Sequence, residues 1–172
     1  KYEKTVNLSL FSNFEFLIVH SGSQRSLSTS LYNERRNECE EASKILNIKN
    51  LRDARFTMLN ELGGKLLKRA RHVISENERV QICLNALQKN DYRTFGSKMY
   101  ESHHSLSNDY QVSSELLDNI IKKAKLLNIT GGRLTGAGFG GCCVFLTEKD
   151  SSKKIFKFLK TDFKNLSLVD II

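Results

Sequence analysis

The apolar positions of this chain form three successive patterns: a strand-like opening, a central block with helical spacing, and a strand–helix–strand ending. Residues 14–19 are rich in β-forming side chains, and residues 5–10 alternate weakly between apolar and polar. Both stretches are therefore predicted to be strands, joined by a turn at Ser12-Asn13. A polar segment over residues 21–30 separates them from the helical block.

The central block repeats apolar residues every three or four positions, which is typical of amphipathic helices. The pair Gly63-Gly64 interrupts this spacing. The sequence Ser75-Glu76-Asn77-Glu78 fits a capping box, so a new helix is predicted to begin there. Helices are predicted over residues 32–46, 51–59, 66–74, 75–87, 91–104 and 113–128.

The end of the chain returns to β-type sequence. Residues 142–146 are predicted to form a buried strand, Ser151-Ser152 begins a helix, and residues 166–172 form a closing strand. This order predicts an α+β fold, in which a small antiparallel sheet carries a block of helices on one face. A chain of 172 residues is long enough to bury a sizeable core, so residues 1–172 are expected to form one domain.

The segment GGRLTGAGFGG at residues 131–141 holds six of the ten glycines of the chain. Such a segment can adopt positive φ at several positions and lets its backbone approach another group closely. A run of exposed N–H groups can form a concave anion site, so the segment indicates phosphate or nucleotide chemistry. A tight connection whose glycines only permit close packing explains the same composition equally well.

The surroundings of this segment distinguish it from two common phosphate sites. Gly136, Gly138 and Gly141 satisfy G-x-G-x-x-G, but a dinucleotide site needs a strand before the loop and a helix after it. Here a helical stripe is predicted before the segment and a strand after it, so that site is not expected. No Gly-Lys-Ser or Gly-Lys-Thr follows, so the P-loop pattern also fails.

The net charge of +8 raises the question of a nucleic-acid partner. The basic residues are scattered, and the run at residues 122–125 lies largely opposite the apolar stripe of its helix, so no nucleic-acid partner is predicted. No apolar run approaches the ~20 residues that a membrane span needs, so no membrane partner is predicted either. The first four residues contain no apolar signal segment.

The thiols and imidazoles of the chain do not form a metal-binding pattern. The cysteines match no zinc or thioredoxin spacing, and His103 and His104 are adjacent and so cannot share one helix face. No metal site is predicted. The cysteines are expected to be buried free thiols, which favours a cytoplasmic localisation. They are Cys39, Cys83, Cys142 and Cys143.

Three segments together resemble the galactokinases of the GHMP small-molecule kinase family. They are SGSQRSLSTSLYNERRNECEEA at residues 21–42, DYRTFGSKMYESHHSLSNDYQV at residues 91–112, and GRLTGAGFGG at residues 132–141. Their order and spacing match over nearly the whole chain, and the resemblance is to the C-terminal portion of that family only. It implies a GHMP kinase C-terminal domain that lacks the N-terminal, ATP-binding half.

The resemblance also assigns residues. Tyr32 matches the family tyrosine that lines the sugar pocket, although Leu31 stands where the family often has Glu. The third GHMP motif, a loop beside the phosphate loop, matches a set of six residues. These are Gly136, Ala137, Gly138, Phe139, Gly140 and Gly141.

The activity implied by the resemblance is ATP-dependent phosphorylation of the anomeric hydroxyl of galactose, giving galactose 1-phosphate. The implied partners are galactose, ATP and the missing half of the enzyme, with ATP and Mg²⁺ bound mainly by that half. No catalytic residue is assigned to these 172 residues, so the isolated chain is expected to be inactive. A related kinase acting on N-acetylgalactosamine and a non-catalytic sugar sensor or interaction protein on the same fold remain alternatives.

Overall fold

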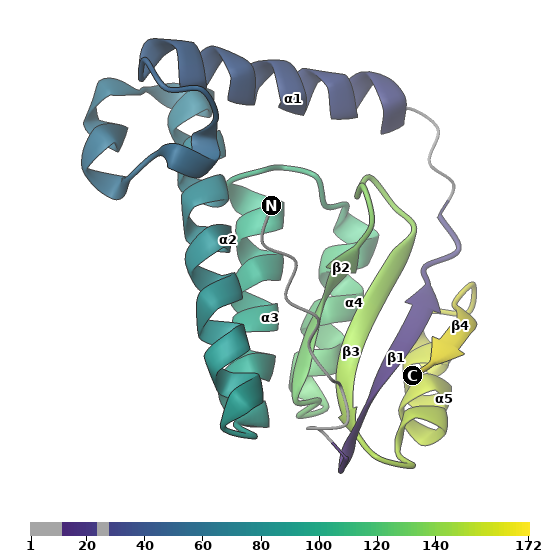
Figure 1. Ribbon diagram of the computed structural model, residues 1–172. Coiled ribbons are helices and arrows are strands. Elements are labelled where there is room, and N and C mark those ends of the chain that lie inside the picture. The colour runs from purple at the N-terminus through teal and green to yellow at the C-terminus, as the bar shows by residue number, and fades with distance from the viewer. Residues whose placement is uncertain (1–11, 24–27) are drawn as a thin grey trace.

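A computed structural model describes residues 12–23 and 28–172 of the chain (Figure 1). The predicted strand at residues 5–10 lies outside the described residues. Four strands, five α-helices and two short 3₁₀ helices follow one another in this part of the chain. In order, they are β1 Phe14–His20, α1 Ser28–Ile45, η2 Leu51–Asp53, η3 Phe56–Glu61, α2 Gly64–Gln88, α3 Tyr92–Asn108, α4 Glu115–Leu126, β2 Gly131–Thr135, β3 Cys142–Glu148, α5 Ser152–Asp162 and β4 Ser167–Ile171.

The strands form one antiparallel sheet in the order β2-β3-β1-β4. In the central pair, Leu17 of β1 lies opposite Phe145 of β3. In the neighbouring pair, Leu134 of β2 lies opposite Cys143 of β3. Successive side chains of a strand point to opposite faces. The register therefore brings Leu17, Leu134, Cys143 and Phe145 to one face, and all four are buried.

Helices α4 and α5 cover this face of the sheet (Figure 1). The stripe of α4 buries Leu117, Ile120, Ile121 and Ala124, and α5 adds Leu159 to the same core. Ser114 begins α4 as an N-cap whose hydroxyl accepts from the Leu117 N–H at 3.3 Å. The predicted architecture, an antiparallel sheet with helices packed on one face, is confirmed.

Helix α3 lies along the edge of the sheet formed by β2. A Cβ on Gly96 of α3 would lie only 2.1 Å from the carbonyl oxygen of Thr130, so this glycine permits the close approach of helix and strand. The Tyr100 hydroxyl donates to the carbonyl of Ile129 at 2.8 Å. Helix α2 packs against α3, and α1 packs against α2.

A second apolar cluster stabilises the helices away from the sheet. It joins α1, the two 3₁₀ helices and the first half of α2, which meet at one end of the molecule (Figure 1). Its buried members are Ala42, Leu46, Leu51, Leu59, Leu62, Ala70 and Ile74.

Helix α2 runs without a break through the predicted capping box. Within the helix, the Ser75 hydroxyl donates to the carbonyl of His72 at 3.0 Å and accepts from Arg79. Glu76 bonds Arg79 and accepts from the Ser102 hydroxyl on α3 at 2.8 Å. The predicted helix start at Ser75 is therefore wrong, because these polar side chains serve packed neighbours and the continuing helix instead of a cap.

Three further predictions need correction. The helix predicted from Tyr32 begins at Ser28, and the single helix predicted over residues 51–59 is two 3₁₀ helices. Gly131–Thr135, predicted as part of a loop, is strand β2, because its backbone pairs with β3 from Gly131 opposite Leu146 to Thr135 opposite Cys142.

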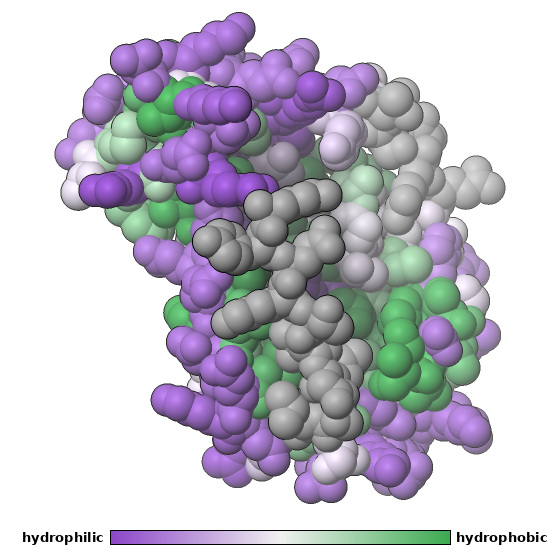
Figure 2. Space-filling view, in the orientation of Figure 1, coloured by the Kyte–Doolittle hydropathy of each residue, from purple (hydrophilic) through white to green (hydrophobic). Residues whose placement is uncertain are grey.

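The surface is mixed in polarity. Figure 2 shows hydrophilic side chains over α1 and apolar side chains gathered over β4, where Leu168, Val169 and Ile172 are exposed. Among the described helices, none combines the length and the hydropathy that crossing a bilayer requires.

Candidate functional site

The glycine loop, defined as residues 136–141, connects β2 to β3 as the turn of a hairpin. A strand thus precedes the loop, contrary to the prediction of a helix-to-strand connection. A strand also follows it, so the strand–loop–helix order of a dinucleotide site is absent here. Five of its six residues have positive φ: Gly136, Gly138, Phe139, Gly140 and Gly141.

The loop is seated on the connection between α3 and α4. The Phe139 N–H donates to the carbonyl oxygen of Val112 over 2.6 Å. A Cβ on Gly138, where φ is +83°, would lie 2.2 Å from the same oxygen. Gly138 is therefore required for backbone shape, as the sequence predicts. The Val112 carbonyl is the backbone group on which the loop packs.

The segment after β1 lies against the other side of the loop. The Ser21 N–H donates to the carbonyl of Gly141 at 2.8 Å, and a Cβ on Gly140 would lie 3.2 Å from Ser23 Oγ. The loop is thus held between two backbone segments that are far apart in the sequence. A left-handed, glycine-rich turn of this kind lets another group approach the backbone closely.

Tyr32 lies near the beginning of α1, and 54% of it is exposed. Figure 1 shows that this end of α1 and the β2–β3 connection lie at the same end of the sheet. The fold therefore brings the two predicted site elements to one region, although more than a hundred residues separate them in the sequence. Neighbouring Leu31 is half-buried.

A buried charge cluster, which the sequence pattern does not predict, lies beneath α1. Glu38 of α1 accepts from Arg35 and from Arg69 of α2, each at 2.7 Å, and Lys65 Nζ lies 3.3 Å from its second oxygen. Arg35, Glu38 and Arg69 are all buried. A buried carboxylate needs such partners, because an unpaired charge in the interior is strongly unfavourable.

A buried imidazole lies beside this charge cluster. The His72 ring stacks on Tyr110 with centroids 4.4 Å apart, and its Nδ1 lies 2.9 Å from Ser105 Oγ. The Tyr110 hydroxyl lies 3.9 Å from Cys39 Sγ on α1. Burial lowers the pKa of His72 to about 4, so this histidine is neutral at pH 7.

His103 and His104 differ although they are adjacent. His103 is buried and accepts from the Leu134 N–H of β2, whereas His104 is exposed and bonds Asn108 on the same helix. Burial lowers the pKa of His103, and the nearby Asp118 carboxylate opposes this effect. Neither histidine is part of a group of three or more metal-ligating side chains within residues 12–23 and 28–172.

Arg133, next to the glycine loop, pairs with a carboxylate. Its Nη1 lies 3.5 Å from Glu76 on α2. Burial by itself raises the pKa of Glu76, but hydrogen bonds from Arg79 and Ser102 outweigh it, and the pKa is lowered overall. Glu76 is therefore an ionised structural partner for Arg133.

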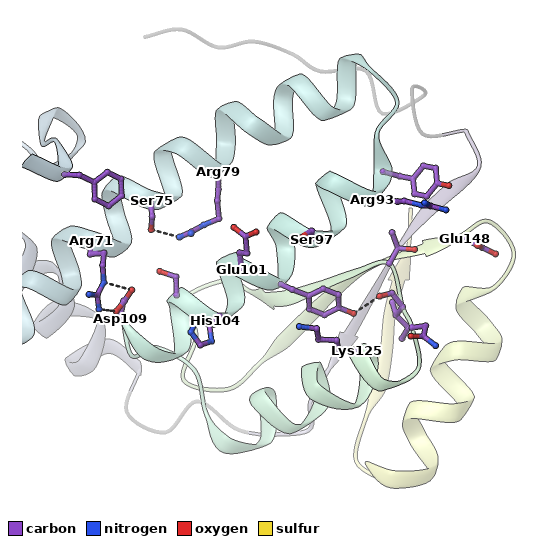
Figure 3. A pocket seen from close by; sticks show the side chains of 17 residues that line it. Arg71, Ser75, Arg79, Arg93, Ser97, Glu101, His104, Asp109, Lys125 and Glu148 are labelled. Carbon is purple, nitrogen blue, oxygen red and sulfur yellow. Dashed lines mark hydrogen bonds and ion pairs between the residues drawn. The ribbon is translucent and has the colours of Figure 1, made fainter.

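A large hollow on the described surface lies elsewhere. It has a volume of about 940 Å³ and runs along the outer side of α3, between α2 and α4 (Figure 3). Two of its arginines bond neighbouring side chains: Arg71 bonds Asp109, and Arg79 bonds Ser75. Neither Tyr32 nor the glycine loop lines it, so the hollow is separate from the candidate site.

Comparison with known proteins relates this chain to one family of kinases. Residues 83–165 match the family model described as GHMP kinases C terminal. These residues run from the second half of α2 to the end of α5 and include the glycine loop. This part of the chain is therefore similar to the C-terminal domain of GHMP kinases.

Individual relatives match most of the chain. A galactokinase of Thermotoga maritima is 39% identical over 160 residues, which are 92% of this chain and 46% of that protein. A galactokinase of Bos taurus is 39% identical over 153 residues, 86% of this chain and 39% of that protein. The chain thus spans less than half the length of these two relatives.

Solved structures show the same relationship. The crystal structure of Lactococcus lactis galactokinase complexed with galactose matches with a TM-score of 0.84 and 31% identity, over 91% of this chain and 44% of that chain. The Methanococcus jannaschii mevalonate kinase matches with a TM-score of 0.60 and 19% identity, over 99% of this chain and 44% of that chain. The second likeness shows that the GHMP kinase C-terminal fold is shared with mevalonate kinase.

Proposed function

We propose that this chain is the C-terminal portion of a galactokinase, which transfers the γ-phosphoryl group of ATP to the anomeric hydroxyl of galactose. The observation that carries the proposal is the 39% identity to galactokinases over 92% of the chain. It is supported by the difference in TM-score between the galactokinase structure, 0.84, and a mevalonate kinase structure, 0.60.

The two site elements have different roles in this proposal. Tyr32 contacts the sugar, and the exposure of its side chain near the start of α1 is consistent with that role. The glycine loop borders the transferring phosphoryl group, and its left-handed backbone supports a close approach of that group. Phosphoryl transfer depends mainly on positioning and on stabilising charge, so rigid walls around the two substrates are a substantial contribution.

ATP and Mg²⁺ are bound mainly by residues outside these 172. The catalytic residues also lie outside them. The relatives are more than twice as long as the part that matches, which leaves room for a second half. In this arrangement the chain supplies the sugar-side wall and one side of the phosphate site. Mg²⁺ offsets charge on the transferring group when it is bound.

Two other functions share most of this support. A kinase for N-acetylgalactosamine would need the same fold and a wider sugar pocket, and a sugar sensor would keep the fold without turnover. A coupled assay on the natural protein that carries this chain distinguishes them. We expect turnover with galactose, ATP and Mg²⁺. Turnover with N-acetylgalactosamine but not with galactose contradicts the proposal, and so does binding of galactose without turnover.

The isolated 172-residue chain is a useful companion sample in that assay. We expect it to be inactive, since no catalytic carboxylate is assigned to it. Activity that co-purifies with the isolated chain through successive columns would contradict this expectation.

We also propose that the protein works in a reducing compartment, such as the cytoplasm. All four cysteines are free thiols. Cys142 and Cys143 are adjacent in β3, so their side chains point to opposite faces of the sheet.

A further inference from the structure

Arg69 of α2 joins segments of the chain that are far apart in the sequence. Its side chain is 2% exposed. The guanidinium donates through Nε to Glu38 of α1 at 2.7 Å, through Nη1 to the carbonyl of Asp109 at 2.5 Å, and through Nη2 to Gln111 Oε1 at 2.8 Å. One buried side chain thus bonds α1 to the connection between α3 and α4.

That connection is the support of the glycine loop. Gln111 has a φ of +56°, and Val112 follows it. The Val112 N–H donates to the carbonyl of Leu106 at 3.0 Å, and its carbonyl accepts from Phe139 at 2.6 Å. Because Gly138 packs on the same carbonyl without a Cβ, a shift of residues 109–112 would move the loop.

The other end of the link is the helix that carries Tyr32. Glu38 is fixed from within α1 by Arg35 at 2.7 Å, and Arg69 reaches the same Glu38 oxygen from α2. A guanidinium is a planar fork with donors in fixed directions, which an ammonium group cannot reproduce. The direction of each bond therefore fixes how α1 lies relative to residues 109–112.

We propose that Arg69 is a positioning residue that sets the glycine loop relative to the Tyr32-bearing end of α1. Arg69 acts through Glu38 on one side and through Gln111 and Val112 on the other, and touches neither substrate itself. The effect on the loop follows from the contacts alone. The effect on phosphoryl transfer rests on the proposed galactokinase function.

The test uses the natural protein that carries this chain and two pairs of variants. Arg69→Lys keeps the charge and removes the fork. Arg93→Lys is its control, because Arg93 is exposed at the start of α3 and lies over the Tyr92 ring, away from residues 109–112. Gln111→Gly removes the acceptor while favouring the positive φ. Asn90→Gly, at a φ of +55° between α2 and α3, is its control.

Hydrogen exchange at the Phe139 amide reports the loop without any need for activity. We expect it to accelerate about tenfold or more in Arg69→Lys and Gln111→Gly relative to their controls, because the Val112 carbonyl loses its fixed place. The Phe145 amide in β3 serves as the internal reference, since global unfolding would accelerate both amides equally. Unchanged Phe139 exchange in Gln111→Gly overturns the proposal, even if Arg69→Lys fails to fold.

Kinetics provide the second measurement. We expect kcat to fall about 10- to 100-fold in Arg69→Lys, as a misplaced site element typically causes, while the controls keep wild-type values. A purely structural Arg69 would lower Tm and leave kcat of the folded fraction unchanged, which also overturns the proposal. If the wild-type protein does not phosphorylate galactose, the proposed function fails, and the exchange measurement still decides the role of Arg69 in the loop.

Discussion

The backbone N–H of Leu134 donates to Nδ1 of His103 over 3.2 Å, so a histidine of α3 takes the place of a neighbouring strand at the edge of the sheet. Because Nδ1 accepts, the proton of the neutral ring is on Nε2, which lies 3.1 Å from Asp118 Oδ1. Asp118 accepts hydrogen bonds from Ser107 at 2.8 Å and from Ser113 at 2.5 Å. Strand β2, which leads into the glycine loop, is therefore fixed to α3 and α4.

Replacing His103 tests this relationship. His103→Leu leaves the Leu134 N–H buried without an acceptor, which should lower the free energy of unfolding by about 1–3 kcal/mol. His104→Leu is the matched control on the exposed side of the same helix, and we expect a change within about 0.5 kcal/mol. Urea unfolding measures both, and equal losses would show that His103 is an ordinary packing residue.

His72 makes stability depend on pH. Its pKa is about 4 in the folded protein and about 6.5 when unfolded, so the unfolded chain binds the proton more readily. The free energy of unfolding is therefore not reduced by His72 above pH 6.5. It decreases as pH falls from 6.5 toward 4, by roughly 3 kcal/mol in total. Urea midpoints measured from pH 7.5 to 4.5 should show this fall.

The His72→Gln variant identifies the source of that pH dependence. Gln keeps a polar group near Ser105 but does not titrate, so its stability should change less between pH 6.5 and 4.5. Identical slopes for the wild type and the variant would assign the pH dependence to other groups, such as His103.

Periodicity predicted most helices well, because each has an apolar stripe that the sheet or a neighbouring helix covers. The stripe of α4 buries Leu117, Ile120 and Ala124 as its spacing indicates. The prediction from local sequence was wrong at Ser75 and Glu76. There the residues of the capping pattern instead bond side chains on other turns of α2 and on α3. Local sequence contains no information on such tertiary partners.

The candidate site was predictable only in part. The density of glycines indicated a loop with positive φ, and the structure confirms it at Gly138 and Gly140. Strand β2 was missed because its first two residues are glycines, which have low strand propensity, and pairing with β3 overrides that preference. Arg69 stands in a run of basic residues and does not differ from Arg71 until the fold buries one and exposes the other.

Gly138 provides a test of the loop itself. In Gly138→Ala the new Cβ would lie 2.2 Å from the Val112 oxygen at a φ of +83°, so the loop must shift, at a cost of about 1 kcal/mol or more. If the loop borders the transferring phosphoryl group, kcat should fall about 10- to 100-fold while most of the fold remains. Steady-state kinetics and circular dichroism on the same sample measure the two effects.

Gly63→Ala is the control for that variant. Gly63 precedes α2 with a φ of −129°, and no heavy atom lies within 4 Å of the position that an added methyl group would take. We expect wild-type kcat from it. A Gly138→Ala protein that loses thermal stability but keeps kcat in its folded fraction would show that the glycine loop only serves packing.

Tyr32 tests the sugar side of the proposal. If its ring contacts galactose, Tyr32→Ala in the natural protein should raise the KM for galactose more than the KM for ATP, at a cost of about 1–3 kcal/mol in kcat/KM. Tyr32→Phe separates the ring from the hydroxyl, since it retains the apolar contact and loses only a hydrogen bond. Phe158→Ala on α5 is the control, because that ring is similarly exposed, at 51% against 54%. Equal changes in both KM values, or loss of folded protein by circular dichroism, would make Tyr32 a packing residue of α1 and would leave the sugar contact to other side chains.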